Sequence, residues 1–154
     1  MIRTRKHFQA KGSPPPRTRS TLLYWILAII ALLGLADATF LTIAHLTGDD
    51  AVCGSFAGCS AVLGSAYATF KGIPTATFGA MAYFTVFSLA ILAAFGYAWV
   101  RRFLAVVVTA MLLASLYFLY LQAFVLHAFC PFCLFSGAMT FLLAGLLVVL
   151  PADR

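Results

Sequence analysis

Four long apolar runs constrain this chain more than any other feature. They extend over about Thr21–His45, Pro74–Val100, Phe103–His127 and Pro131–Leu150. Each is close to the roughly 20 residues that an α-helix needs to cross about 30 Å of hydrocarbon. We therefore expect an all-α membrane protein whose four transmembrane helices form a bundle.

The composition excludes the soluble alternatives. The chain has 154 residues, of which 64% are hydrophobic and 9% are charged, whereas about a quarter of the residues of a typical soluble domain are charged. The same numbers exclude intrinsic disorder of the whole chain. Four spans leave no room for a separate soluble catalytic domain, so any chemistry has to take place in or beside the bilayer.

Positive charge predicts the orientation of the bundle. Residues 1–20 hold six of the ten Lys and Arg residues and three consecutive prolines, so we expect a disordered basic tail. Cytoplasmic segments are enriched in Lys and Arg. Placing the tail inside also places Arg101, Arg102 and Arg154 inside and leaves only Lys71 outside. We expect both termini to be cytoplasmic, with residues 21–150 as the membrane domain and residues 151–154 as a cytoplasmic end.

All the cysteines then lie on the outer side. Cys53 and Cys59 belong to the outer loop of residues 46–73, and Cys130 and Cys133 lie where the fourth helix begins. The outer side of a bacterial membrane, like the lumen of the endoplasmic reticulum, is oxidising, so cysteines there are read first as disulfide formers. We expect a multi-pass protein of the bacterial inner membrane whose cysteines face the periplasm or the exterior.

The segment Cys130-Pro131-Phe132-Cys133 is typical of a redox-active pair. The positive end of the helix dipole stabilises a thiolate, and the spacing of three residues puts both sulfur atoms on one face of the helix. A permanent disulfide at this spacing would close almost no loop and would stabilise the fold little. A zinc site that also uses His127 would need a fourth ligand and two thiolates, so we expect no metal.

Cys53 and Cys59 offer a second pair on the same side. The two could form a bridge with each other, or either could reach the pair at the helix start. Thiol–disulfide exchange requires sulfur atoms in contact, and a pair in a loop suits such a relay. A static loop disulfide is the structural alternative.

The stretch Ser60–Phe70 is apolar but too short to cross the membrane, which predicts a short surface helix over the outer end of the bundle. Beneath it we expect an apolar cavity. Electrons that reach the Cys130/Cys133 pair need an acceptor. Because the chain carries no haem, flavin or iron–sulfur signature, this acceptor has to be dissolved in the lipid, and a quinone fits. The candidate apolar contacts are Val62, Leu63, Tyr67, Phe78, Phe118 and Leu126, and the candidate polar contacts are Ser65, Thr75 and Gln122. Gln122 could instead form a hydrogen bond between helices.

Asp37 is the only acidic residue inside a span. An ionisable residue within the membrane is by default a functional hypothesis. A hydrogen-bonded structural role and a role in proton transfer both stay open at this point.

Together these features resemble the vitamin K epoxide reductase family over about Thr21–Leu150. The resemblance rests on the four spans, the loop cysteines six residues apart, Ser65 six residues after Cys59, Gly72-Ile73-Pro74 opening the second helix, and the C-P-F-C segment opening the fourth. It implies a four-helix bundle around a quinone, with the loop helix as a lid and Ser65 near the active site.

The resemblance also implies a role for each cysteine. Cys53 would accept electrons from a thioredoxin-fold partner, Cys59 would pass them to Cys130, and Cys133 would face the quinone. Since the chain has no fused thioredoxin-like domain, the implied partner is a separate protein of the DsbA type. The expected activity is disulfide formation in exported proteins, with a ubiquinone, menaquinone or vitamin K type quinone as oxidant.

The sequence departs from the animal members of that family at two positions. Those members resemble one another in an Asn near the start of the second helix and a Tyr four residues after the last cysteine, and the matching residues here are Thr75 and Gly137. Epoxide reduction is therefore not the first expectation. Reduction of vitamin K quinone or its epoxide stays as an alternative, as does a non-enzymatic bundle with static disulfides or a metal.

Overall fold

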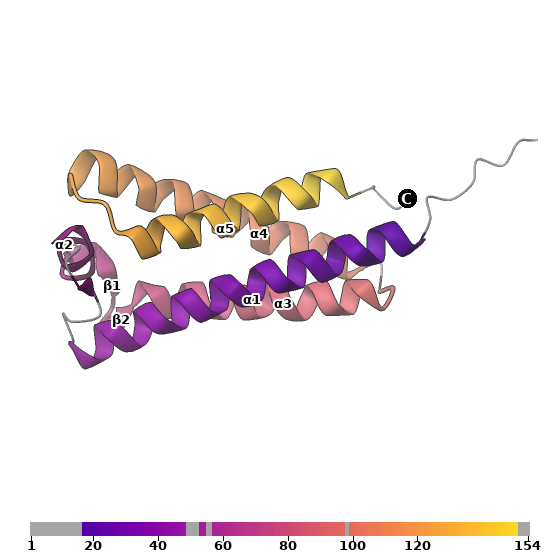
Figure 1. The fold of residues 1–154 in the computed structure, drawn as a ribbon, viewed down its shortest axis with the longest axis horizontal. Coiled ribbons are helices and arrows are strands. Elements are labelled where there is room, and N and C mark those ends of the chain that lie inside the picture. The colour runs from indigo at the N-terminus through magenta and orange to yellow at the C-terminus, as the bar shows by residue number, and fades with distance from the viewer. Residues whose placement is uncertain (1–16, 49–52, 55–56, 98, 151–154) are drawn as a thin grey trace, which may run out of the picture.

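Four long helices form the body of the protein in the computed structural model, which describes residues 17–48, 53–54, 57–97 and 99–150. They are α1 (Arg17–Thr47), α3 (Thr75–Ala94), α4 (Val100–Tyr120) and α5 (Pro131–Val149) (Figure 1). Each is long and apolar enough to span a membrane, α4 being extended by the π-helix η3 (Leu121–Val125). The predicted all-α, four-span architecture is confirmed.

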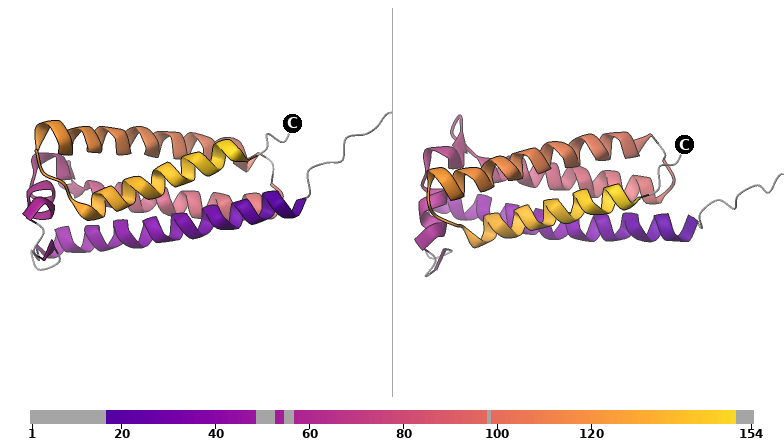
Figure 2. Two further views of the ribbon diagram at one scale, coloured as in Figure 1. Left: turned by 45° about the horizontal axis from the view of Figure 1, so that its top comes forward. Right: turned by 90° about the horizontal axis from the view of Figure 1, so that it is seen from above.

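The helices run side by side along one long axis. α1 packs against α3 and α5, and α4 packs against α3 and α5. The start of α1 and the end of α5 lie at the same end of the bundle (Figure 2). The segments that hold the cysteines lie at the opposite end, which we call the cap end.

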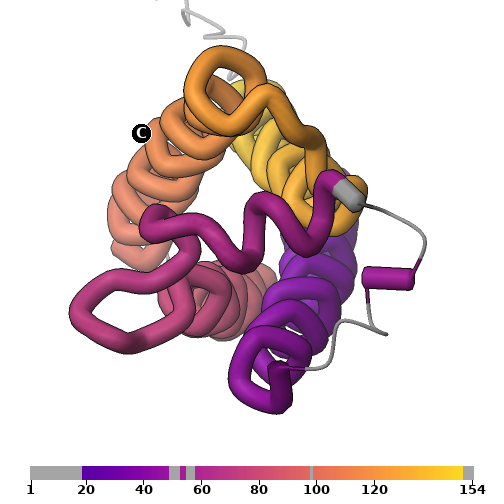
Figure 3. Tube along the Cα trace, turned by 90° about the vertical axis from the view of Figure 1, so that its left-hand side faces the viewer, coloured from indigo at the N-terminus to yellow at the C-terminus, as the bar shows by residue number. Residues whose placement is uncertain are grey.

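The loop of the cap end folds across the helix ends (Figure 3). It contains α2 (Ala57–Leu63), the 3₁₀-helix η2 (Ala66–Ala68) and the strands β1 (Thr69–Phe70) and β2 (Ile73–Pro74). The strands pair antiparallel. A short helix over the bundle was predicted, but its predicted range, Ser60–Phe70, was wrong at both ends.

Local backbone geometry explains the wrong range. Lys71 and Gly72 have φ angles of 51° and 82°, the left-handed conformation that both central residues of a tight hairpin turn adopt. This turn draws Thr69 and Phe70 into a strand. Ser65 ends the helical segment, since its backbone is extended and its hydroxyl donates to the carbonyl of Val62 at 2.7 Å.

The predicted second span was too long. α3 ends at Ala94 rather than at Val100, because Gly96 has a φ of 98° and terminates the helix. The N–H of Tyr97 donates back to the carbonyl of Leu92 at 3.3 Å, the bond that defines a Schellman cap.

The basic residues near the other helix ends also lie differently from the prediction. Arg101 and Arg102, which the predicted spans left as the connection between the second and the third, belong to the first turn of α4. α1 begins at Arg17, so residues 17–20 are helical rather than part of a disordered tail. The remainder of the predicted tail, residues 1–16, and the predicted end, residues 151–154, lie outside the described residues.

The buried core of the bundle lies mainly in the half away from the cap end. It includes Tyr24, Leu27, Ala31, Val86, Ala90, Leu104, Val108 and Leu143. At the edge of this core the ring of Tyr83 on α3 packs directly on Gly34 of α1, where a Cβ would overlap the ring. The Tyr83 hydroxyl donates to the Ser136 carbonyl at 2.6 Å and lies 2.9 Å from the Thr140 hydroxyl, both on α5. One residue thus joins three helices.

We predict that Gly34→Val destabilises the protein by about 1–3 kcal/mol, because overpacked side chains force their neighbours to shift. Gly145→Val on α5 is the matched control, since a Cβ there meets nothing within 4 Å. Thermal unfolding in detergent, followed by circular dichroism, measures both variants. Equal melting temperatures for the two variants would contradict the predicted contact.

Candidate redox site

The cysteines of the loop are joined to each other. Cys53 and Cys59 form a disulfide with their Cα atoms 5.5 Å apart. Cys59 lies in α2 and is completely buried, while Cys53 is 4% exposed. Of the pairings that the sequence left open, the structure has the bridge within the loop.

The second pair is in the thiol form at the start of α5. Cys130 has an extended backbone and caps the helix, and Pro131 occupies the first helical turn, where a missing N–H costs nothing. The Cys133 side chain hydrogen-bonds to that of Cys130. The predicted placement of this pair at a helix N-terminus is confirmed.

Gln122 holds the connection between α4 and α5 in place. It lies in the π-helix, in which the N–H of Leu126 donates to the carbonyl of Leu121 at 2.8 Å, and it is only 2% exposed. Its side-chain oxygen accepts the N–H of Cys130 at 2.9 Å, and its backbone oxygen accepts the N–H of Ala128 at 3.2 Å. The sequence left two roles open for Gln122, a polar contact in a cavity and a hydrogen bond between helices. The structure has the hydrogen bond to the start of α5, and Gln122 also lines the cavity described below.

The two cysteine pairs meet in one apolar cluster at the cap end. Cys53, Cys59, Val62 and Cys130 are buried together, and the partly buried side chains around them are Leu63, Leu126, Ala128, Phe132 and Cys133. The backbone of Gly58 lies so close to the Phe129 carbonyl that a Cβ would overlap it. Figure 3 shows the start of α2 beside the start of α5. Glycine therefore permits the approach that brings Cys59 to Cys130.

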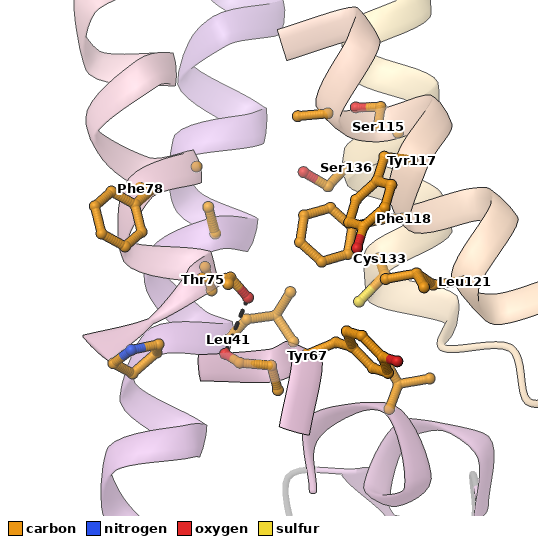
Figure 4. Close-up of a pocket in the computed structure, with 18 of the residues that line it drawn as sticks. Leu41, Tyr67, Thr75, Phe78, Ser115, Tyr117, Phe118, Leu121, Cys133 and Ser136 are labelled. Carbon is orange, nitrogen blue, oxygen red and sulfur yellow. Dashed lines mark hydrogen bonds between the residues drawn. The ribbon is translucent and has the colours of Figure 1, made fainter. Parts of the chain in front are cut away.

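A cavity of about 890 Å³ lies below the cap, between all four long helices. Cys133 is part of its wall, whereas Cys130 is not. In Figure 4 the sulfur of Cys133 points into the space that Leu41 and Thr75 face from the other side. The two thiols of the α5 pair thus face different surroundings: Cys130 faces the loop disulfide and Cys133 faces the cavity.

All nine residues proposed from the sequence as quinone contacts line this one cavity: Val62, Leu63, Ser65, Tyr67, Thr75, Phe78, Phe118, Gln122 and Leu126. What the cavity binds is a separate question and stays a prediction. α1 also contributes to the cavity wall, through Ala38, Leu41 and His45, and these residues were not predicted from the sequence. Their spacing of three and four residues marks one helix face and was the available signal.

A comparison with known proteins decides the family. The model of the Vitamin K epoxide reductase family matches residues 25–148, which is most of the chain. The chain belongs to the vitamin K epoxide reductase family. With its four spans, it is a multi-pass membrane protein, and its family membership supports a redox enzyme.

In this family member the surroundings of Cys130, which precedes the span of α5, favour the thiolate over the thiol. The hydrogen bond from Cys133 lowers the pKa of Cys130 to about 7, although burial opposes the shift. The N–H groups of Cys133 and Phe132 lower it further, and the charge of Asp37 raises it. A thiolate at this position is a ready nucleophile for disulfide exchange.

Asp37 is close enough for its charge to act on Cys130. Its Oδ2 atom is buried and has no hydrogen-bond partner among the described residues. The hydrogen-bonded and the proton-transfer roles weighed from the sequence both stay predictions. His127, by contrast, is exposed and does not line the cavity.

We predict that a thiolate of Cys130 forms with a midpoint near pH 7 when the loop disulfide is intact, because the pKa of Cys130 is lowered to about 7. The thiolate is present above this pH and lost below it. The ultraviolet absorbance of the thiolate, measured against a Cys130→Ala control, gives the midpoint. Cys133→Ala removes the largest cause of the shift and should move the midpoint upward. An unchanged midpoint in that variant would be evidence against the hydrogen bond as the cause.

Proposed function

We propose that this protein is a quinone-dependent thiol–disulfide oxidoreductase. It takes electrons from a thioredoxin-fold partner of the DsbA type, passes them from the Cys53/Cys59 pair to the Cys130/Cys133 pair, and delivers them to a membrane quinone. The net result is disulfide formation in exported proteins. The observation that carries the proposal is the division of the α5 thiols, with Cys130 in the buried cluster with Cys59 and Cys133 on the cavity wall.

The first half of the cycle is thiol–disulfide exchange. The reduced partner attacks Cys53 in the loop disulfide, forms a mixed disulfide with it, and releases Cys59 as a thiolate. A second thiol of the partner then resolves the mixed disulfide. Cys59 is free to attack a disulfide between Cys130 and Cys133 at the Cys130 sulfur, because these two residues share the apolar cluster. Cys53 completes the exchange and the loop disulfide re-forms.

The second half of the cycle takes place at the cavity. A quinone takes up two electrons and two protons to become a hydroquinone, and the thiols of Cys130 and Cys133 supply the electrons as they close their disulfide. The cavity wall is mainly apolar, and all four spans contribute to it. Such a cavity suits a ligand dissolved in lipid. We propose the ubiquinone, menaquinone and vitamin K types as the acceptor class.

Two of the proposed polar contacts, Ser65 and Thr75, already donate their hydroxyl hydrogens to backbone carbonyl groups. The Ser65 hydroxyl donates to Val62 at 2.7 Å and the Thr75 hydroxyl donates to Ala68 at 3.0 Å. In these positions each oxygen is an acceptor toward the cavity. The Gln122 amide nitrogen has no protein partner among the described residues, so it is the better donor for a quinone oxygen.

The cellular arrangement belongs to the same proposal. The start of α1 and the end of α5 share one end of the bundle, which supports placing both termini in the cytoplasm. The cysteines at the cap end then face the periplasm or the exterior of a bacterial inner membrane. The excess of Lys and Arg near the other end supports this orientation.

We predict that the purified protein in detergent reduces a quinone when a reduced DsbA-type protein is supplied, and that turnover requires all four cysteines. Cys133→Ala should abolish quinone reduction and still permit capture of the partner by Cys53. Cys130→Ala should leave Cys59 unable to pass electrons on. The assay follows quinone absorbance, with a parallel arm that supplies vitamin K epoxide.

The outcomes of this assay separate the alternatives. Reduction of the epoxide without any oxidation of a partner would favour the vitamin K reductase. Full activity of either cysteine variant would contradict the relay order. Four cysteines that stay oxidised or metal-bound whatever the quinone supplied would favour a bundle without enzymatic function.

A further inference from the structure

We infer that His45 is the residue that delivers a proton to the quinone from the outer side of the membrane. The inference rests on the proposed function, since it concerns the cavity into which Cys133 faces. It goes beyond that proposal by assigning a catalytic residue on α1, a helix that carries none of the cysteines.

His45 has an unusual position on the cavity wall. It is the only His, Asp, Glu, Lys or Arg among the residues that line the cavity. Histidine is the side chain that exchanges protons most readily near neutral pH. No hydrogen bond or ion pair joins His45 to another part of the chain that the structure describes. Its ring nitrogens are therefore available to a ligand.

The helix register places His45 between the cavity and the outer water. It lies one turn after Leu41, which faces Cys133 across the cavity in Figure 4. It is two residues from the end of α1, where Leu46, Thr47 and Gly48 are exposed. A side chain there can take a proton from water and present it within the cavity.

Other groups on the wall are less suited to this task. The hydrogens of Ser65 and Thr75 are already donated to carbonyl groups. The Tyr83 hydroxyl donates to the Ser136 carbonyl at 2.6 Å. The Gln122 amide can donate a hydrogen bond but cannot give up a proton near neutral pH.

The balance of the reaction shows why an external proton is needed. As the sulfur atoms of Cys130 and Cys133 form a bond, two electrons pass to the quinone and two protons are gained by its oxygens. The thiols release two protons in total. Since the pKa of Cys130 is lowered to about 7, part of the protein already holds Cys130 as a thiolate, without its proton, when the reaction begins. The quinone then has to recover that proton from outside the cysteine pair.

The test compares two histidines of the cap end. His45→Asn keeps a hydrogen-bonding group in the cavity but removes the titratable ring. His127→Asn is the matched control, because His127 is exposed and outside the cavity wall, and its φ of 48° is one that Asn tolerates well. Two rates are measured for each variant: quinone reduction at saturating quinone, and a single round of exchange between the reduced partner and the Cys53–Cys59 disulfide.

We expect His45→Asn to lower the rate of quinone reduction by about 100-fold or more, the usual loss when a general acid is removed, while the exchange rate is unchanged. His127→Asn should match the wild type in both. Added imidazole should accelerate His45→Ala and leave the wild type unaffected. Because imidazole can rescue only a folded protein, this variant separates lost chemistry from lost folding.

Three results would overturn the inference. His45→Asn could reduce quinone within about twofold of the wild-type rate. His45→Ala could melt like the wild type and be slow, yet gain nothing from imidazole, which would assign His45 to binding rather than to proton delivery. A wild-type protein that exchanges disulfides with its partner but reduces no quinone would refute the proposed function itself, and the role of His45 with it.

Discussion

The contact between α2 and the start of α5 is the interaction on which the site depends. Here Gly58 lies against the Phe129 carbonyl, and Gln122 accepts the N–H of Cys130. These contacts fix the position of Cys130 beside the loop disulfide. Without them Cys130 would not be held in the apolar cluster that contains Cys59.

The same contact gives the two neighbouring thiols of α5 different surroundings. Cys130 is buried in the cluster that holds Cys59, while Cys133 lines the cavity. A single turn of helix therefore connects the buried cluster around the loop disulfide with the cavity between the spans. The hydrogen bond between the two thiols favours the thiolate of Cys130, which in the proposed cycle is the sulfur that exchanges with the loop.

Periodicity and composition were sufficient to predict the spans, the helix start at Cys130 and the nine cavity residues, because helix length and apolar character follow directly from residue type. The loop was predicted less well. The hairpin at Lys71 and Gly72 and the cap at Gly96 depend on left-handed backbone, which a single glycine permits but does not require. The choice of the Cys130 N–H as the partner of Gln122 depends on the turn between α4 and α5. The place of His45 on the cavity wall depends on how the helices pack, although its spacing from Ala38 and Leu41 already marked one helix face.

The most direct test of the account is whether Cys59 and Cys130 form a disulfide with each other. In the double variant Cys53→Ala, Cys133→Ala, only these two cysteines are left, and mild oxidation followed by peptide mass mapping identifies their bond. We expect an intramolecular Cys59–Cys130 disulfide in most molecules of this variant, and much less bridging in the double variant Cys53→Ala, Cys130→Ala. Free thiols in the first variant, or equal bridging in the second, would contradict the order in which electrons pass from the loop to the cavity.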